Sequence, residues 1–143
     1  MKIAIIGQGY VGLTISVFAA EHHTVVGFDV NQGVVDALNS GKSHIEGVDS
    51  SILSRWVKSG RFKATTKGNG INDCEIVIIA VPTPLTENRQ PDLTYLESAC
   101  KTIGENLKKP VLVINESTSF PGTLRNFIKP AIERYSVVQV EHL

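Results

Sequence analysis

Apolar residues form two patterns along the chain, and the two patterns alternate. The first is a short, continuous apolar run rich in Val and Ile, which is typical of a strand that is covered on both faces of a parallel sheet. Runs of this kind predict strands at residues 3–6, 24–29, 62–65, 76–81, 111–114 and 137–140.

The second pattern is a longer segment in which apolar residues recur every three or four positions, as on one face of a helix. Val34, Val35 and Leu38 have this spacing. The pattern predicts helices at residues 10–21, between Asn31 and Gly41, and at residues 50–58, 93–107 and 123–134.

Polar residues at the starts of these segments are candidate helix caps. Asn31 is a residue type that commonly accepts a hydrogen bond from the first turn of a helix. The helix at residues 93–107 has two candidates, Asp92 and Thr94, and Thr94 stands in capping-box spacing with Glu97. Thr123 is the candidate cap of the last helix.

Strands that alternate with helices indicate right-handed crossovers and a parallel sheet between two layers of helices. We therefore expect an α/β fold, a doubly wound parallel sheet in three layers. In such sheets the ligand lies beyond the carboxyl ends of the strands. Those ends fall here at Gly7, Asp29, Val81 and Glu116.

Length and charge limit the classes of function. The 143 residues suit a single domain, which we place over residues 1–143. The formal net charge is zero, so no general attraction to nucleic acid or to an anionic membrane is expected. The first apolar run stops at Gly7, so the run is too short for a signal peptide or a membrane span.

Two cysteines, Cys74 and Cys100, have no neighbouring His and no CxxC spacing. We interpret both as small buried apolar residues, and we expect no metal site. A reducing, cytoplasmic setting is the default for such a chain.

The sequence GQGYVG at residues 7–12 matches the GxGxxG pattern of dinucleotide-binding proteins. The pattern alone is common, but here it directly follows a strand and opens a helix, which is its functional context. Gly7 permits the tight turn, Gly9 lets a pyrophosphate approach the backbone, and Gly12 lets the helix pack closely on the strand. The motif predicts a Rossmann-type fold.

An acidic residue supports the same interpretation. Asp29 ends the second strand 22 residues after Gly7, where such folds place the acid that hydrogen-bonds the ribose hydroxyls. The free amides at the helix start, including those of Tyr10 and Val11, point at the phosphates. No Arg or Lys follows at residues 30–33 to attract a 2′-phosphate, so NAD is favoured over NADP.

Two further segments follow strands. At residues 81–86 (VPTPLT) a proline-stiffened turn either presents the Thr83 hydroxyl to the cofactor or simply connects strand and helix. At residues 116–123 (ESTSFPGT) hydroxyls and a carboxylate gather at the mouth of the sheet, and the alternative is that they only form turns and caps.

Three segments resemble the UDP-glucose/GDP-mannose dehydrogenase family in its N-terminal NAD-binding domain, and the resemblance covers essentially the whole chain. They are GQGYVGLT (7–14), VPTPLTENRQPDLTYLESA (81–99) and ESTSFPGT (116–123). The segment at residues 81–99 is most similar to the branch that acts on UDP-N-acetylhexosamines of the glucosamine or mannosamine type.

The resemblance implies an NAD-dependent UDP-sugar 6-dehydrogenase of nucleotide-sugar and polysaccharide biosynthesis. Such enzymes oxidise the C6 alcohol of the sugar to a carboxylate with two NAD, through a cysteine thioester. A UDP-glucose 6-dehydrogenase is the alternative within the family. The full-length enzymes bind a UDP-sugar and form homo-oligomers.

The resemblance also implies roles for particular residues. Tyr10 and Val11 contact the pyrophosphate, and Asp29 contacts the adenosine ribose. Thr83 lies along the cofactor, and we place Pro82 in the cofactor site with it. Thr118 matches the family's active-site threonine, which touches the cofactor and helps to order the catalytic water.

Two features depart from the family. Val34 stands where many relatives carry a basic residue near the ribose. The catalytic Cys, Lys and Asn of the family lie beyond this length, and neither Cys74 nor Cys100 has the glycine-rich context of that nucleophile. We therefore interpret the chain as a fragment that lacks the middle helix and the UDP-sugar-binding domain and is inactive alone. A stand-alone, non-catalytic NAD-binding module is the rival hypothesis.

Overall fold

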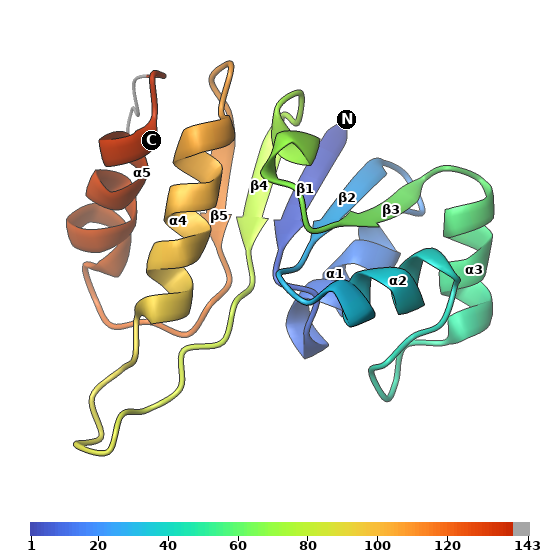
Figure 1. Cartoon of the computed structure of the whole chain (residues 1–143), viewed down its shortest axis with the longest axis horizontal. Helices are drawn as coiled ribbons and strands as arrows, with labels where there is room; N and C mark the ends of the chain where they lie inside the picture. The colour runs from blue at the N-terminus through green and yellow to red at the C-terminus, as the bar shows by residue number, and fades with distance from the viewer. Residues whose placement is uncertain (139–143) are drawn as a thin grey trace.

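Five parallel strands form one sheet in the computed structural model, which describes residues 1–138. The order across the sheet is β3-β2-β1-β4-β5, which is the strand order of a doubly wound Rossmann-type sheet. The strands are β1 (Lys2–Ile6), β2 (Thr24–Phe28), β3 (Phe62–Thr65), β4 (Ile76–Ile79) and β5 (Leu112–Asn115) (Figure 1). The expected parallel α/β sheet is confirmed. Of the strand expected at residues 137–140, the first two residues form a bend and the others lie outside the described residues.

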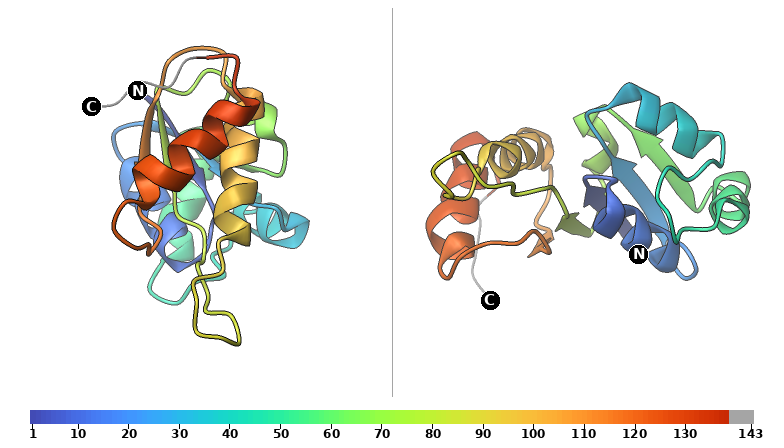
Figure 2. Two further views of the ribbon diagram at one scale, coloured as in Figure 1. Left: turned by 90° about the vertical axis from the view of Figure 1, so that its left-hand side faces the viewer. Right: turned by 90° about the horizontal axis from the view of Figure 1, so that it is seen from below.

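Helices cover both faces of this sheet. Figure 2 shows α4 and α5 on one side of the molecule, apart from α1, α2 and α3. Among residues 1–138 no helix is both long enough and apolar enough to cross a membrane. The helices are α1 (Tyr10–Ala19), α2 (Gln32–Asn39), α3 (Ser50–Lys58), η1 (Gly68–Ile71), α4 (Thr94–Asn106), η2 (Leu124–Ile128) and α5 (Lys129–Tyr135).

The alternation of side chains along β1 divides the core into two clusters. Ile3 and Ile5 point into the cluster beneath α1, α2 and α3, whereas Ala4 and Ile6 point into the cluster beneath η1, α4 and α5. All four side chains are buried. This two-sided burial explains why the strands have continuous apolar sequences.

The caps of the helices agree only in part with the expectation. Asn31 caps α2, because its Oδ1 accepts the Val34 N–H at 3.2 Å. At α4 the cap position is Leu93, whose side chain makes no cap hydrogen bond. Asp92, the residue before it, accepts both the N–H and the hydroxyl of Thr94 on its Oδ1, at 3.0 and 2.6 Å. These hydrogen bonds lower the pKa of the Asp92 carboxyl. The capping box of Thr94 is wrong, since its hydroxyl is already given to Asp92 and the Glu97 N–H bonds the Leu93 carbonyl.

The last helix begins differently from the prediction. The Thr123 hydroxyl donates back to the Phe120 carbonyl at 2.7 Å, so Thr123 closes the preceding turn and does not cap the helix. The first helical residues form the wider turn η2 and then continue into α5. Pro130, the second residue of α5, has no N–H to donate into the turn before it, which favours this wider winding.

Candidate dinucleotide site

The carboxyl ends of β1, β2 and β4 are held in register by backbone hydrogen bonds just past the strands. The Gly7 N–H donates to the Phe28 carbonyl, and the Ala80 N–H donates to the Ile6 carbonyl, both at 2.8 Å. The loops that carry the candidate residues therefore leave the sheet at the same edge, which is the lower edge in Figure 1.

Each glycine of the GQGYVG loop meets a different environment. Gly7 has a φ of +93°, and a side chain there would put Cβ 2.6 Å from the Ala80 carbonyl oxygen. A Cβ at Gly12 would strike the Gly7 carbonyl. A Cβ at Gly9 would meet nothing within 4 Å. The fold thus requires Gly7 and Gly12, whereas Gly9 leaves open space at the surface, as a diphosphate needs.

This open space adjoins the start of α1. Gly9 is the cap residue of the helix and offers no side-chain acceptor to the first turn. The first intrahelical bond runs from the Leu13 N–H to the Gly9 carbonyl, so the earlier amides are free to bind an anion. Tyr10 and Val11, at this start, are 67% and 48% exposed. The loop therefore combines access, free N–H donors and the positive end of a helix dipole.

Asp29 lies directly beside this loop. Its Oδ2 accepts the Gln8 N–H at 2.9 Å, and its Oδ1 accepts the Asn31 N–H at 2.9 Å. Both carboxylate oxygens are thus fixed, and each keeps a lone pair that a ribose hydroxyl can use. The sequence predicted that Asp29 lies near the GQGYVG loop, and the structure adds a direct hydrogen bond between the two.

A second pair of loops follows β4 and β5, and two hydrogen bonds tie them together. The Val81 N–H donates to Ser117 Oγ at 3.0 Å, and Thr83 Oγ1 donates to the Thr118 carbonyl at 2.8 Å. Because the single Thr83 proton is used in this way, the hydroxyl faces any ligand as an acceptor only. Pro82 and Thr118 lie on the same loops, and both are exposed.

The two groups of candidate residues are neighbours. A Cβ at Gly7 would lie 3.2 Å from Val81 Cγ1, and one at Gly12 would lie 3.5 Å from Ala80 Cβ. The glycine loop and the loop after β4 therefore touch at the end of the sheet, and together they form one continuous edge.

Sequence reasoning missed two polar residues here, Ser117 and Gln8, which are buried to 7% and 0% exposure. Asn115 holds Ser117 in place: its Nδ2 donates to the Ser117 carbonyl and its Oδ1 accepts the Ser117 N–H. Ser16 could have pointed to Gln8, because Ser16 is a polar residue on the buried face of the first helix. A buried hydroxyl needs a hydrogen-bond partner, and here the partner is the Gln8 side chain.

Neither cysteine is suited to nucleophilic chemistry. Both are buried free thiols, and burial raises the pKa of Cys74. Burial, together with the charge of Glu97, raises the pKa of Cys100 to about 12. The thiolate is the reactive form, so both side chains are inert near neutral pH.

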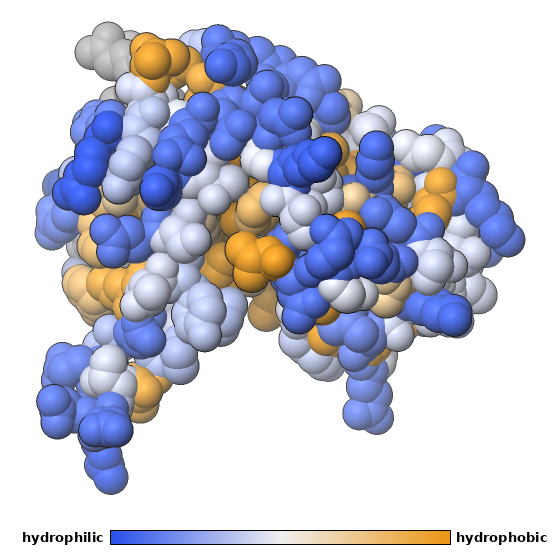
Figure 3. All heavy atoms as spheres, viewed as in Figure 1, coloured by the Kyte–Doolittle hydropathy of each residue, from blue (hydrophilic) through white to orange (hydrophobic). Residues whose placement is uncertain are grey.

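The segment after Thr83 forms a hairpin arm, residues 84–92, which the sequence did not predict. Leu85 and Pro91 pair as an antiparallel bridge, and the Asp92 N–H donates to the Pro84 carbonyl at 2.7 Å. The arm projects from the carboxyl edge (Figure 1), and its tip is hydrophilic (Figure 3). Figure 3 also shows apolar atoms near the centre of this face.

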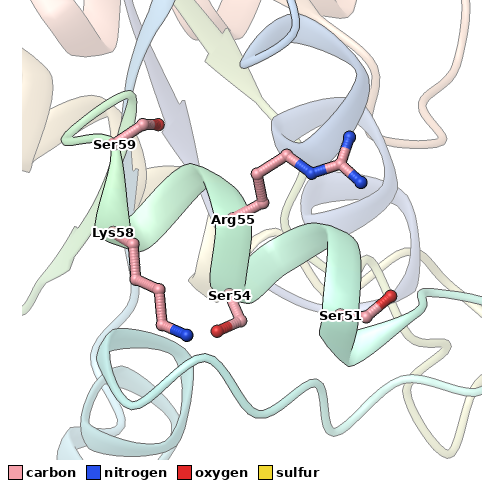
Figure 4. Close-up of a pocket in the computed structure, with 5 residues that line it drawn as sticks. All are labelled: Ser51, Ser54, Arg55, Lys58 and Ser59. Atoms are coloured by element: carbon pink, nitrogen blue, oxygen red, sulfur yellow. The ribbon is translucent and has the colours of Figure 1, made fainter.

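A shallow hollow on α3 is a different kind of surface. It is lined by Ser51, Ser54, Arg55, Lys58 and Ser59, which all come from this helix or the residue after it (Figure 4). In Figure 4 the Arg55 side chain extends away from those of Ser54 and Lys58. The hollow lacks the converging loops that mark the carboxyl edge of the sheet.

Comparisons with known proteins identify the family of the chain. The family described as "UDP-glucose/GDP-mannose dehydrogenase family, NAD binding domain" matches residues 1–142. The chain is 39% identical over 95% of its length to UDP-N-acetyl-D-glucosamine 6-dehydrogenase of Pseudomonas aeruginosa, and 42% identical over 99% to UDP-N-acetyl-D-mannosamine dehydrogenase of Campylobacter jejuni. It spans 32% and 35% of those relatives, about a third of their length.

A solved structure gives the same result at the level of the fold. GDP-mannose dehydrogenase from Pseudomonas aeruginosa superposes with a TM-score of 0.90 and is 34% identical. The match covers 95% of this chain and 33% of that one.

Proposed function

The chain belongs to the UDP-glucose/GDP-mannose dehydrogenase family as its NAD-binding domain, and from this premise we propose that NAD lies across the carboxyl ends of β1, β2 and β4. The observation that carries the proposal is the environment of Gly9. Its missing side chain leaves open space where the amides of α1 are free, while the carboxylate of Asp29 is fixed 2.9 Å from the Gln8 amide of the same loop. An open anion site beside a ribose acceptor fits the two polar parts of the adenosine half of NAD.

At the phosphate side, the N–H groups of Tyr10 and Val11 donate to the pyrophosphate, and Gly9 lets it approach. Gly7 and Gly12 shape the loop from within the fold. Asp29 accepts hydrogen bonds from the ribose hydroxyls, and its charge disfavours a 2′-phosphate, so the site selects NAD over NADP.

At the other side, the loops after β4 and β5 meet the nicotinamide half. Thr83 accepts a hydrogen bond from the cofactor, Pro82 fixes the turn beside it, and the exposed Thr118 contributes its hydroxyl. NAD supplies the hydride acceptor when it is bound. By the family's pattern Thr118 also helps to order the catalytic water, since a hydroxyl both donates and accepts.

We further propose that the whole protein is a 6-dehydrogenase. It oxidises the C6 alcohol of a UDP-N-acetylhexosamine to the uronate, a four-electron change that reduces two NAD. The activities for which the two relatives are named support this sugar class, with UDP-glucose as the alternative. Because the two thiols of residues 1–143 are buried with raised pKa values, we expect this domain alone to be inactive. We place the working protein in the cytoplasm as a homo-oligomer.

Calorimetric titration tests the cofactor assignment. The chain is titrated with NAD and with NADP, and the titrations are repeated on Asp29→Ala. Hydrogen bonds to charged groups typically contribute about 1.5–3 kcal/mol, so we expect Asp29→Ala to weaken NAD binding by roughly tenfold or more. Asp36→Ala is the matched control, because Asp36 is an exposed carboxylate of α2 with the same charge. Equal affinity of the unmodified chain for both cofactors would contradict the ribose assignment.

The enzyme assignment requires the full-length protein. UDP-N-acetylglucosamine, UDP-N-acetylmannosamine and UDP-glucose are each supplied with NAD, and NADH is measured. Two NADH per sugar with one of the N-acetylhexosamines is the expected result. Turnover of UDP-glucose alone moves the substrate to the alternative, and no NADH with any of them favours the non-catalytic module.

A further inference from the structure

Gln8 occupies a position that the GxGxxG pattern leaves unspecified, yet its side chain is completely buried. Its Nε2 donates to the Ile5 carbonyl at 3.0 Å and to the Gly7 carbonyl at 3.3 Å. Its Oε1 accepts the Ser16 hydroxyl at 3.0 Å. The amide thus joins the end of β1, the glycine loop and the buried face of α1.

The neighbouring strand is shaped around this side chain. A Cβ at Gly27 of β2 would lie 2.7 Å from Gln8 Cδ and 2.8 Å from Oε1. Gly27 does not have a positive φ, so the backbone does not require glycine there. The absence of a side chain at residue 27 is explained by the space that Gln8 occupies.

The backbone of Gln8 faces the cofactor side. Its N–H donates to Asp29 Oδ2 at 2.9 Å. The same residue is therefore fixed through its side chain on the inside of the fold and through its main chain to the ribose acid. If Gln8 rotates, the peptide plane at the start of the GQGYVG loop moves with it. The Gln8 N–H that bonds the Asp29 carboxylate moves as well.

We propose that Gln8 is a positioning residue for NAD binding: through its buried amide it sets the geometry of the phosphate loop and of Asp29, without touching the cofactor. This rests on the proposed function, because it concerns the same site. An apolar residue of similar size fills the same volume but makes none of the bonds that fix the loop. Buried, fully bonded amides specify one arrangement in this way.

The test separates loop geometry from folding. Gln8→Leu combined with Ser16→Ala removes the Gln8 amide and the Ser16 hydroxyl together, so that only the Ile5 and Gly7 carbonyls lose a donor. We expect this double variant to remain folded, with a lower urea midpoint than the unmodified chain, and to bind NAD about tenfold more weakly, as the loss of loop hydrogen bonds predicts. Ser16→Ala alone is the matched control for the change in α1.

A second variant displaces the Gln8 side chain by a change in the neighbouring strand β2. Gly27→Ala leaves Gln8 in the sequence but displaces its amide, so NAD affinity should fall. Combining Gly27→Ala with Gln8→Ala removes the clash. Thermal stability should then recover from the Gly27→Ala value, while NAD affinity stays low because the hydrogen bonds of the Gln8 amide are still absent.

The hydrogen-exchange rate of single amides distinguishes positioning of the loop from a general loss of stability. In the folded double variant that combines Gln8→Leu with Ser16→Ala, the backbone amide at position 8 should exchange about tenfold faster, as expected when its bond to Asp29 is loosened. The amides of β3 should keep their rates. Native NAD affinity in either folded double variant overturns the positioning role. If the unmodified chain fails to bind NAD, the proposed function fails and this inference fails with it.

Discussion

At the scale of single residues, the three glycines of one motif differ in what a side chain would meet. Gly7 and Gly12 face protein atoms, and Gly9 faces open space. The motif predicted a tight turn at Gly7, access at Gly9 and close packing at Gly12, and the space around the three residues fits these roles.

This difference predicts opposite effects for two similar substitutions. Gly9→Ala should leave the free energy of unfolding nearly unchanged and weaken NAD binding, because its methyl group occupies space that the pyrophosphate needs. Gly12→Ala should destabilise the chain by about 1–3 kcal/mol or more, because overpacking forces the helix away from β1. Urea denaturation and calorimetry measure the two quantities separately. Native NAD affinity in Gly9→Ala would show that the open space does not receive the cofactor.

The buried thiol of Cys100 makes the free energy of unfolding depend on pH. Burial raises the pKa of Cys100 to about 12 from its ordinary value of 9.0, so the folded chain holds the neutral thiol while the unfolded chain ionises first. The stability that this contributes is complete below about pH 9 and is lost as the pH rises toward 12. The stability advantage over Cys100→Ala should therefore narrow by up to about 1.4 kcal/mol per pH unit in that window. Parallel pH profiles of the two proteins would argue that the thiol is not shielded from water.

Sequence reasoning proposed Asp29, the glycine loop and Thr83 from their types and their positions after the strands, and Thr118 from the resemblance to the family. It missed Gln8 and Ser117, because their roles depend on partners from other elements. Gln8 bonds Ser16 eight residues away, and Ser117 bonds Val81 from the loop after another strand. Such pairs become neighbours only when the sheet has formed.

At the scale of elements, hydrophobic periodicity predicted α3 and β3 to the residue, at 50–58 and 62–65, and the other strands and α-helices of the structure to within a few residues. It did not predict η1, and residues 137 and 138 of the expected last strand form a bend. The ends of the elements were less predictable, because end residues compete for the same hydrogen bonds. Asp92 and Thr94 were both plausible caps by type, but the cap position falls on Leu93, and Asp92 bonds the first residue of the helix from one position before the cap. The hairpin arm at residues 84–92 was not predicted, because its backbone bonds, such as Thr86 N–H to the Gln90 carbonyl, form within a polar segment that has no apolar alternation.

The open edge of the sheet gives a prediction at this scale. β3 is an edge strand, and the side chain of Asn39, the last residue of α2, bonds both polar groups of Ala64: its Nδ2 donates to the carbonyl at 3.0 Å and its Oδ1 accepts the N–H at 2.8 Å. Asn39→Ala should cost about 2 kcal/mol, roughly 1 kcal/mol for each bond, and expose the edge to association.

The measurement is urea unfolding followed by the fluorescence of Trp56, the single tryptophan. Asn88→Ala, at the exposed tip of the arm, is the control and should unfold at the urea concentration of the unmodified chain. A loss in Asn39→Ala no larger than that of the control would mean that water replaces the side chain at this edge.

At the scale of the whole molecule, the sheet order brings the ends of β1, β2 and β4 together, and the candidate residues lie on loops that leave the carboxyl edge of this sheet. The alternation of patterns in the sequence predicted this layering, because parallel strands with right-handed crossovers have few other arrangements. What the pattern could not supply is how the loops are joined, through Asp29 at one side and through Ser117 and Thr83 at the other.

Mixing the isolated chain with NAD and a UDP-N-acetylhexosamine should produce no NADH. The chain can bind NAD without transferring a hydride to it. The family's reaction uses a cysteine nucleophile, and the two thiols of this chain are buried with raised pKa values. Absorbance of NADH follows the reaction, with the full-length protein as the positive control. Turnover by the isolated chain would show that its residues suffice for the first oxidation.

Amide chemical shifts measured during an NAD titration show where NAD binds. If NAD lies across the carboxyl edge, the largest changes will fall at residues 7–11, at Asp29, and at the loops around Thr83 and Thr118, with little change along α3. Saturable changes centred on the α3 hollow, or none in residues 7–11, would contradict this position of NAD.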